Sequence, residues 1–341
     1  MRVREFEVRS SRNEELEEVV RLSNRVSRQM RPRHAPGSLD EFRMIAMLPG
    51  AIRWWSRVED DDGAPLALLG ASHEDDGSNP NVLRVSIMVD PDQRRRGVGS
   101  LGLSWVVDKA KEIDRERLSG QVFDTDPTGW AFAEAVGAEK KLDFHMNVLN
   151  LSDLDFEMLA AWADDGPRRA PGYSIEVIEG EWPEQYLDDF ARLWYVLERD
   201  MPMPEGHQPR EWTADLMRGI IKQAIEHNDS LTAVAFEDAT QRAVGLSHLI
   251  RRHADPKTWV VTTTMVEPEH RGRAIGKWVK AEVNLAANDR WPGAEWTETG
   301  NAFTNNAMLG INHAMGFRHE YTNTNVEVTV ARAEAYLQKM R

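Results

Sequence analysis

Apolar residues recur along the chain at two different periods, and the alternation between them predicts the order of the structural elements. In residues 14–29 the apolar positions lie three or four residues apart, which is the spacing of an amphipathic helix. Short runs rich in β-branched residues, such as residues 83–89, predict strands. The N-terminal half follows the order strand, helix, helix, three strands, helix, strand, helix and strand. These predicted elements span residues 1–8, 14–29, 39–48, 51–59, 64–72, 83–89, 97–113, 118–123, 129–136 and 140–149.

The C-terminal half repeats this order of elements. Between the two series, residues 151–172 contain a short predicted helix and then a segment rich in proline, glycine and charge, which is typical of an exposed boundary. We therefore predict an N-terminal domain at residues 1–150, a linker at 151–172 and a C-terminal domain at 173–341. The predicted elements of the C-terminal domain span residues 173–178, 183–199, 210–226, 231–237, 243–253, 259–266, a helix ending near 288, 294–299, 305–315 and 317–329.

One short segment occurs in both halves at a constant spacing. Residues 89–99 and 266–276 share Val, Pro, Arg and Gly at an offset of 177 residues, and each segment follows a predicted strand and precedes a predicted helix. The first backbone N–H groups of a helix lie at the positive end of its dipole and bind phosphate. Small residues let the backbone approach the anion, and the neighbouring arginines add charge-assisted contacts. The repeat therefore predicts one phosphate-binding loop in each domain.

Composition and charge narrow the class of protein. The chain has 341 residues, of which 41% are hydrophobic and 29% charged, as in soluble globular proteins of about two domains. No apolar stretch approaches the roughly 20 residues of a membrane span, and the N-terminus lacks a signal core, so we expect a cytoplasmic protein without membrane contact. The absence of cysteine excludes disulfides and thiolate metal sites, and we predict no metal. A net charge of −14 argues against nucleic-acid binding and is compatible with an amine-bearing substrate.

The two loops resemble the signature of the GNAT superfamily of acyl-CoA N-acyltransferases, Arg/Gln-x-x-Gly-x-Gly/Ala after a strand ending Val-x-Pro. Gly316 and Phe317, eleven and twelve residues after Asn305, are similar to the downstream element of the family, whereas the first copy has Asp126 in place of the Asn. The resemblance covers nearly the whole chain and is especially close to tandem GNAT proteins of actinobacteria, a group related to mycothiol synthase. It implies an α/β (α+β) fold with two tandem GNAT domains, each a mixed central sheet with splayed strands flanked by helices.

The same resemblance implies that the cofactor is acetyl-CoA. The CoA pyrophosphate would lie on backbone N–H groups of residues 94–100 and 271–277. The pantetheine arm would pair with the strands ending at Val89 and Val266, where neighbouring strands separate, and a strand N–H there would polarise the thioester carbonyl. The expected cofactor-binding residues are Val89, Arg94, Arg95, Arg96, Gly97, Val98, Gly99, Ser100, Met265, Val266, Arg271, Gly272, Arg273, Ala274, Ile275, Gly276, Lys277, Asn305 and Asn312.

The catalytic groups are less well indicated. Many family members place a Tyr four residues before the downstream Gly, where it protonates the leaving thiolate, but this chain has Ala133 and Asn312. Asn312 would either contact the CoA sulfur or pack at the edge of the cofactor. Because an amine attacks a thioester only as the neutral base, a carboxylate, a histidine or a relayed water is expected to accept its proton. Glu298 is the candidate base and Tyr321 the candidate proton donor, with a surface glutamate and a core tyrosine as the alternatives.

The segment between the first two helices of the C-terminal domain covers the acceptor pocket in GNAT folds. Here Asp200 and Glu205 are candidates to pair with a cationic amine, and His207 is a candidate proton shuttle. The alternative is an exposed loop stiffened by three prolines.

The combined hypothesis is an N-acetyltransferase that transfers acetyl from acetyl-CoA to a small-molecule primary amine by direct attack. The C-terminal domain would be catalytic and the N-terminal domain structural or degenerate. A catalytically degenerate GNAT that acts as an acyl-CoA sensor or scaffold is the alternative, and two competent domains are a third possibility. Aminoglycosides, amino acids or peptides, polyamines and amino-sugar thiols all stay open as acceptors, and the chain is expected to be a monomer or a homodimer.

Overall fold

The computed structural model describes residues 1–31, 33–201, 203, 206–302 and 306–340. Within these residues it contains twelve strands and ten α-helices in a mixed α/β arrangement. The chain divides into two compact units, which we call unit 1 and unit 2. Unit 1 comprises Met1–Phe144, Met203–Gln208 and Tyr321–Arg341, and unit 2 comprises His145–Pro202 and Pro209–Glu320.

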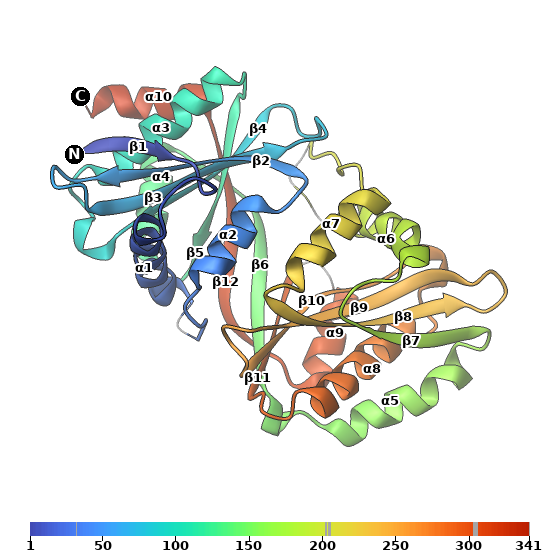
Figure 1. Cartoon of the computed structure of the whole chain (residues 1–341). Coiled ribbons are helices and arrows are strands. Elements are labelled where there is room, and N and C mark those ends of the chain that lie inside the picture. Colours follow the sequence, from blue (N-terminus) through green and yellow to red (C-terminus); the bar gives the residue numbers. More distant parts are fainter. Residues whose placement is uncertain (32, 202, 204–205, 303–305, 341) are drawn as a thin grey trace. The chain divides into compact units, whose positions relative to one another are not determined.

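Unit 1 is a mixed sheet with helices on both faces. Helices α3 (Val98–Glu112) and α10 (Val330–Lys339) cover one face, and α1 (Asn13–Met30) and α2 (Leu39–Met47) cover the other (Figure 1). The apolar positions that predicted α1 are buried against the sheet, as an amphipathic stripe requires. In sheet order the strands are β1 (Arg2–Phe6), β2 (Ala51–Glu59), β3 (Pro65–Glu74), β4 (Val82–Val89), β5 (Arg117–Phe123), β12 (Arg318–Thr329) and β6 (Glu139–Asn150), and α4 (Pro127–Val136) joins β5 to β6.

Unit 2 has the same layered arrangement. Helices α8 (Ile275–Arg290) and α5 (Phe156–Arg169) cover one face of its sheet, and α6 (Leu187–Asp200) and α7 (Ala214–Ala224) cover the other (Figure 1). In sheet order its strands are β6, β11 (Trp296–Ala302), β10 (Thr258–Val266), β9 (Arg242–Arg252), β8 (Asn228–Glu237) and β7 (Tyr173–Glu179), and α9 (Asn306–Met315) follows β11.

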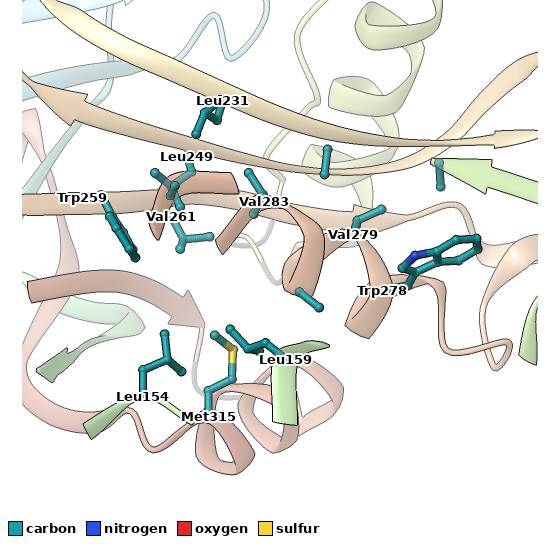
Figure 2. Close-up of a cluster of buried hydrophobic side chains, with 14 of the residues drawn as sticks. Leu154, Leu159, Leu231, Leu249, Trp259, Val261, Trp278, Val279, Val283 and Met315 are labelled. Atoms are coloured by element: carbon teal, nitrogen blue, oxygen red, sulfur yellow. The ribbon is translucent and has the colours of Figure 1, made fainter. Parts of the chain in front are cut away.

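The core of unit 2 lies between its sheet and the pair α5 and α8. Trp259 and Val261 of β10 point into the same interior as Val279 of α8 and Leu159 of α5 (Figure 2). All four side chains are at least 97% buried, which is the condition under which apolar burial contributes most to stability. This core holds the start of α8 against the end of β10, where the second predicted loop lies.

The last strand of each repeat begins in one unit and ends in the other. The first half of β6 belongs to unit 1 and its second half, from His145, to unit 2, while β12 passes into unit 1 at Tyr321. In unit 1, β12 pairs antiparallel with β5 from Asn323 to Thr329, and α10 then packs on α3. In unit 2, α5 packs on α8 in the same way. The two repeats therefore exchange their final strand and the helix that follows it.

The two compact units divide the chain differently from the predicted domains. Residues 321–341, predicted in the C-terminal domain, are part of unit 1, because β12 completes the sheet of that unit. Within residues 151–172, predicted as a linker, Leu154 and Leu159 are buried in the core of unit 2. Local sequence patterns predicted most of the elements but not α10, and they carry no information about which distant strand completes a sheet.

Candidate active site

In both units two neighbouring parallel strands separate after a short pairing. Strands β4 and β5 pair only from Val82–Arg84 to Arg117–Ser119, and β10 and β11 pair only from Thr258–Val261 to Trp296–Thr299. Beyond these points, within the described part of the chain, the facing edges of β4 and β10 pair with no strand on that side. An unpaired strand edge presents N–H and C=O groups that an extended ligand can bind. The splayed strands that the sequence predicted are therefore present in each unit.

Each of these strands runs into a loop with an unusual backbone. In the first loop Arg95 and Gly97 have positive φ angles of 62° and 82°, and in the second Gly272 and Ala274 have 78° and 64°. These pairs occupy matching positions of the repeat, so the two loops share one backbone conformation. Left-handed residues that alternate with ordinary ones turn successive N–H groups toward one side and create an anion-binding concavity.

The helices that follow the loops begin without a side-chain cap. Gly97 is the N-cap of α3 and Ala274 the N-cap of α8, and neither position provides a side-chain hydrogen bond to the first turn. The first N–H groups of a helix need partners from outside the helix, and a phosphate satisfies them. Both loops therefore have the geometry of an anion-binding helix start.

An ion pair fixes the residue that precedes the loop proline in each unit. Arg25 of α1 donates to the buried carboxylate of Asp90, and Arg192 of α6 donates to the buried carboxylate of Glu267. Charge-assisted hydrogen bonds between an arginine and a carboxylate are stronger than neutral ones. These pairs were not predicted from the sequence, although the first helix of each domain contains arginines.

The first arginine of each loop is held by an acidic residue. Arg94 Nη1 lies 3.3 Å from Asp126 Oδ1 and donates to Thr128 Oγ1 at 2.6 Å. Arg271 Nη2 donates to Asp200 Oδ2 at 2.6 Å, and its Nε donates to the Val266 carbonyl at 2.8 Å. Asp200, predicted to contact a substrate amine, is thus an ion-pair partner of the predicted phosphate loop.

The electrostatic surroundings keep Asp200 ionised. Burial by itself would raise the pKa of this carboxyl, but hydrogen bonds from Arg199 and Arg271 outweigh burial and lower its pKa below the usual value. Two arginines therefore already neutralise the carboxylate in this conformation.

Strand β10 carries a bulge where it separates from β11. The register with β9 shifts between Val261 and Thr263, which leaves Thr262 as the extra residue, whereas β4 pairs with β3 in continuous register from Arg84 to Val89. A bulge re-aims the backbone and side chains of a strand and is over-represented beside active sites. The bulge distinguishes unit 2 from unit 1.

Polar side chains gather beside this bulge on the face of the sheet that α6 covers. His248 is buried, its Nδ1 lies 2.7 Å from the Thr262 hydroxyl and its Nε2 lies 3.1 Å from the Ser230 hydroxyl. Burial lowers the pKa of His248 to about 4, so the ring is neutral at ordinary pH. Glu298 pairs in register with Val260 and points to this same face, because its neighbours on β11 are buried toward α8.

Asn312 lies on the opposite side of the sheet from this face. Its side chain is buried, its Oδ1 accepts a hydrogen bond from Lys280 Nζ, and its Nδ2 donates to Asn301 Oδ1 at 2.5 Å. Lys277, expected at the phosphate, has its ammonium 4.9 Å from the ring centroid of Trp162 on α5. Asn305 lies outside the described residues.

Two of the remaining predicted residues, Tyr321 and His207, belong to unit 1, whereas Glu298 belongs to unit 2. Tyr321, the candidate proton donor, is buried in unit 1 with its ring 5.8 Å from that of Phe123. His207 belongs to the segment that is part of unit 1, where the neighbouring Gln208 exchanges two hydrogen bonds with the Asn79 side chain. Glu205 lies outside the described residues. The structure therefore places Tyr321 and His207 in a different unit from Glu298.

A hollow of about 590 Å³ opens on the α6 and α7 side of unit 2. It is lined by residues of α6, including Asp188 and Tyr195, and by the segment from Pro209 to Ala214. The lining does not include the loop before α8 or the edge of β10. Within the described residues no group of acidic and histidine side chains has the arrangement of a metal site, and no helix is long and apolar enough to cross a membrane.

Comparison with known proteins agrees with this architecture. Residues 16–138 match the acetyltransferase (GNAT) family. The chain is similar to a tandem GNAT protein from the clavulanic acid biosynthesis pathway, solved without AcCoA. The two sequences are 22% identical, the match covers 96% of this chain and 98% of that chain, and the TM-score is 0.80. It is also similar to a GCN5-related N-acetyltransferase from Sphaerobacter thermophilus, with 13% identity, 96% and 95% coverage, and a TM-score of 0.64. No curated protein matches the chain.

A third similar structure is a GCN5-related glucosamine N-acetyltransferase region of a fungal multi-domain GH3 β-N-acetylglucosaminidase. It shares 13% identity and a TM-score of 0.64, and the match covers 96% of this chain but 38% of that one. The chain thus contains a GNAT acetyltransferase domain at residues 16–138. As a whole it has the fold of tandem GNAT proteins. The family match covers the first copy, although the sequence motifs of the second copy had appeared closer to those of the family.

Proposed function

We propose that the protein is an acyl-CoA-dependent N-acyltransferase that transfers acetyl from acetyl-CoA to a small-molecule primary amine, with unit 2 as the catalytic unit. The observation that carries the proposal is the bulge at Thr262. Thr262 lies where β10 leaves β11, in the strand that leads to the uncapped start of α8. A bound thioester supplies the activated acyl group. Unit 1 has a splayed pair of strands and a loop of the same shape but no such bulge in β4.

The roles of the residues follow from where they lie. The backbone N–H groups at the start of α8 would hold the diphosphate, and the free edge of β10 would hold the extended arm. A strand N–H at the bulge would donate to the thioester carbonyl oxygen, where negative charge develops during attack. Each of these roles uses backbone groups, whose positions the fold fixes before the ligand arrives.

Glu298 is the candidate for the base. It points to the same face as His248 and is half-buried, whereas His248 is neutral and a weak base. A carboxylate can accept the amine proton directly or through a water, as direct attack requires. The acceptor would therefore approach from the α6 face, and the cofactor would lie in the opening between β10 and β11.

Matched substitutions at the two helix starts test the proposal. A Cβ at Gly276 would lie 3.7 Å from Val266, and one at Gly99 would lie 3.5 Å from Phe132, so alanine fits at both positions. Gly276→Ala and Gly99→Ala are therefore folding controls. Gly276→Glu places a carboxylate beside the diphosphate and is expected to weaken CoA binding in unit 2 by about tenfold or more, because like charges repel.

Calorimetric titration with acetyl-CoA and turnover with a panel of amines give the readout. Loss of turnover in Gly276→Glu but not in Gly99→Glu supports catalysis in unit 2. The reverse pattern assigns catalysis to unit 1, and equal losses indicate that both units are competent.

A non-enzymatic acyl-CoA sensor is the second candidate function. The sensor is favoured because Ala133 and Asn312 stand where many GNAT enzymes have the tyrosine that donates a proton, and neither residue can act as an acid. Tight binding of acetyl-CoA with no turnover for any amine tested would support the sensor.

A further inference from the structure

A lysine is completely buried in the core of unit 2. Lys280, on the second turn of α8, has a relative exposure of 0%. Its Nζ donates to Asn312 Oδ1, lies 3.9 Å from the sulfur of Met308 and lies 5.4 Å from the ring centroid of Phe317. Among the residues that the structure describes, these partners are all neutral. A buried ammonium with three N–H donors and one amide acceptor is under-partnered, which is costly unless an anion completes the site.

The matching positions of unit 1 show that the fold does not require this polar cluster. At the offset of the repeat, Lys280 corresponds to Leu103, and Asn284, which is buried one turn further along α8, corresponds to Val107. Asn312 corresponds to Ala133. Leu103 and Val107 lie on α3, the helix of unit 1 that matches α8, and their side chains pack in the apolar core of that unit. An apolar side chain at the position of Lys280 is therefore compatible with the packing of this helix, and the burial of an ammonium there needs a reason other than packing.

The cluster lies beside the opening between β10 and β11. Asn301, which accepts from Asn312, is two residues beyond Thr299, where the pairing with β10 ends. Lys280 is four residues after Gly276 and so shares its face of α8, about 6 Å further along the helix from the loop. A Cβ at Gly276 would lie 3.8 Å from Ile311, so this face looks toward α9.

We propose that Lys280 donates the proton that the sulfur of CoA takes up when the acyl group is transferred, and that Asn312 orients its ammonium. This inference rests on the proposed function in unit 2. The amine nitrogen forms a bond to the carbonyl carbon, the carbon–sulfur bond breaks, and its electron pair goes to sulfur. The Lys280 ammonium then gives one proton to the thiolate and becomes a neutral amine, while the acceptor nitrogen loses its proton to the base. Solvent reprotonates Lys280 when CoA leaves.

The protonation equilibrium of Lys280 suits this role. Burial lowers the pKa of its ammonium to about 7, so both protonation states are populated near neutral pH. Among the described residues, the side chains that contact its ammonium are Asn312 and Met308 from α9 and Phe317 before β12, and none of these titrates. Burial is therefore the cause of the lowered pKa, and none of these contacts is a carboxylate.

Two substitutions on α8 form a matched pair, because each replaces a residue of unit 2 by the residue found at the matching position of unit 1. Lys280→Leu removes the proposed donor, and Asn284→Val removes a buried polar side chain of the same helix that has no proposed role. Lys280→Leu is expected to lower kcat by about a hundredfold near pH 6, with KM for acetyl-CoA unchanged within about twofold. The ratio of wild-type to variant kcat should fall as pH rises through about 7, because the wild-type donor is lost. Asn284→Val should keep both kcat and the pH profile.

A measurement that needs no turnover separates this inference from the proposed function. The thiol pKa of bound CoA, followed by thiolate absorbance, should be lower in the wild type than in Lys280→Leu and unchanged in Asn284→Val. An equal thiol pKa in all three proteins overturns the inference even if the wild type acetylates amines. A weaker CoA affinity with an unchanged thiol pKa also overturns it, since Lys280 would then bind the arm of the cofactor. If the thiol pKa is lowered in the wild type but no amine is acetylated, the contact between Lys280 and the CoA sulfur is supported and the proposed function is contradicted.

Discussion

Arg271, the first arginine of the loop before α8, donates from Nη2 to Asp200 Oδ2 at the end of α6, at a distance of 2.6 Å. The loop arginine is thus already paired in this conformation. Any phosphate that binds the loop has to share Arg271 with that carboxylate.

The first prediction follows from this competition. Asp200→Asn removes a negative charge beside the loop and is expected to tighten CoA binding in unit 2 by a few-fold at low salt, with a smaller effect at high salt. Calorimetric titration at two ionic strengths measures the change. A raised KM for the amine with unchanged CoA affinity would instead support the substrate-binding role that the sequence predicted for Asp200.

A second prediction concerns the backbone of the two loops. Ala274 has a φ of 64°, which disfavours any residue with a Cβ, whereas Gly occupies position 97 of the first loop with a φ of 82°. Ala274→Gly should therefore stabilise the protein by about 1 kcal/mol, and Gly97→Ala should destabilise it by a similar amount. Denaturant unfolding of both variants checks the signs, and a destabilised Ala274→Gly would contradict the strain argument.

The third prediction is a pH dependence of stability from His248. Its pKa is lowered from 6.5 to about 4 in the folded protein, so below about pH 6.5 the unfolded chain binds a proton that the folded protein does not. This group therefore makes the free energy of unfolding fall as pH drops from 6.5 toward 4, by on the order of 3 kcal/mol.

His248→Asn keeps hydrogen-bonding groups but does not titrate in this range. The difference in free energy of unfolding between wild type and variant should change between about pH 7 and pH 4.5. A difference that is constant over this range would mean that His248 is not held neutral by the fold.

The fourth prediction tests the packing of α5 in unit 2. A Cβ at Gly166 would lie 2.3 Å from the ring of Trp278 on α8, so Gly166→Ala should destabilise the protein by about 1–3 kcal/mol. Gly293 has open space around its Cβ position and is the matched control, with an expected change within about 0.5 kcal/mol. Equal effects of the two substitutions would show that α5 is not tightly packed there.

The fifth prediction tests the exchange of strands. Ala333 of α10 is completely buried among residues of unit 1, whereas Ala335 is exposed. Ala333→Glu buries an unpaired charge and should increase hydrogen exchange in α3 and β5, while Ala335→Glu should not. Faster exchange confined to α8 and β10 would contradict the assignment of α10 to unit 1.

The sequence predicted the secondary structure well where a periodic pattern was long. The helix predicted at residues 14–29 is α1 at Asn13–Met30, and the strand predicted at 259–266 is β10 at Thr258–Val266. The helix predicted from residue 210 begins at Ala214, because the Thr213 side chain caps the Leu216 N–H. The repeat also predicted the shared position of the two loops, since their backbone needs small residues at fixed places.

By itself, then, the sequence determined the order of the elements as far as β12, the twofold repeat and the loop at the start of α3 and α8, because all three depend on residues close together in the chain. Only the tertiary structure decided that β12 and α10 complete unit 1, that β10 has a bulge where β4 has none, and that Lys280 is buried. A lysine on an amphipathic helix is normally exposed, and its burial depends on which elements cover that face. Such outcomes come from contacts between residues far apart in sequence, and local patterns do not encode them.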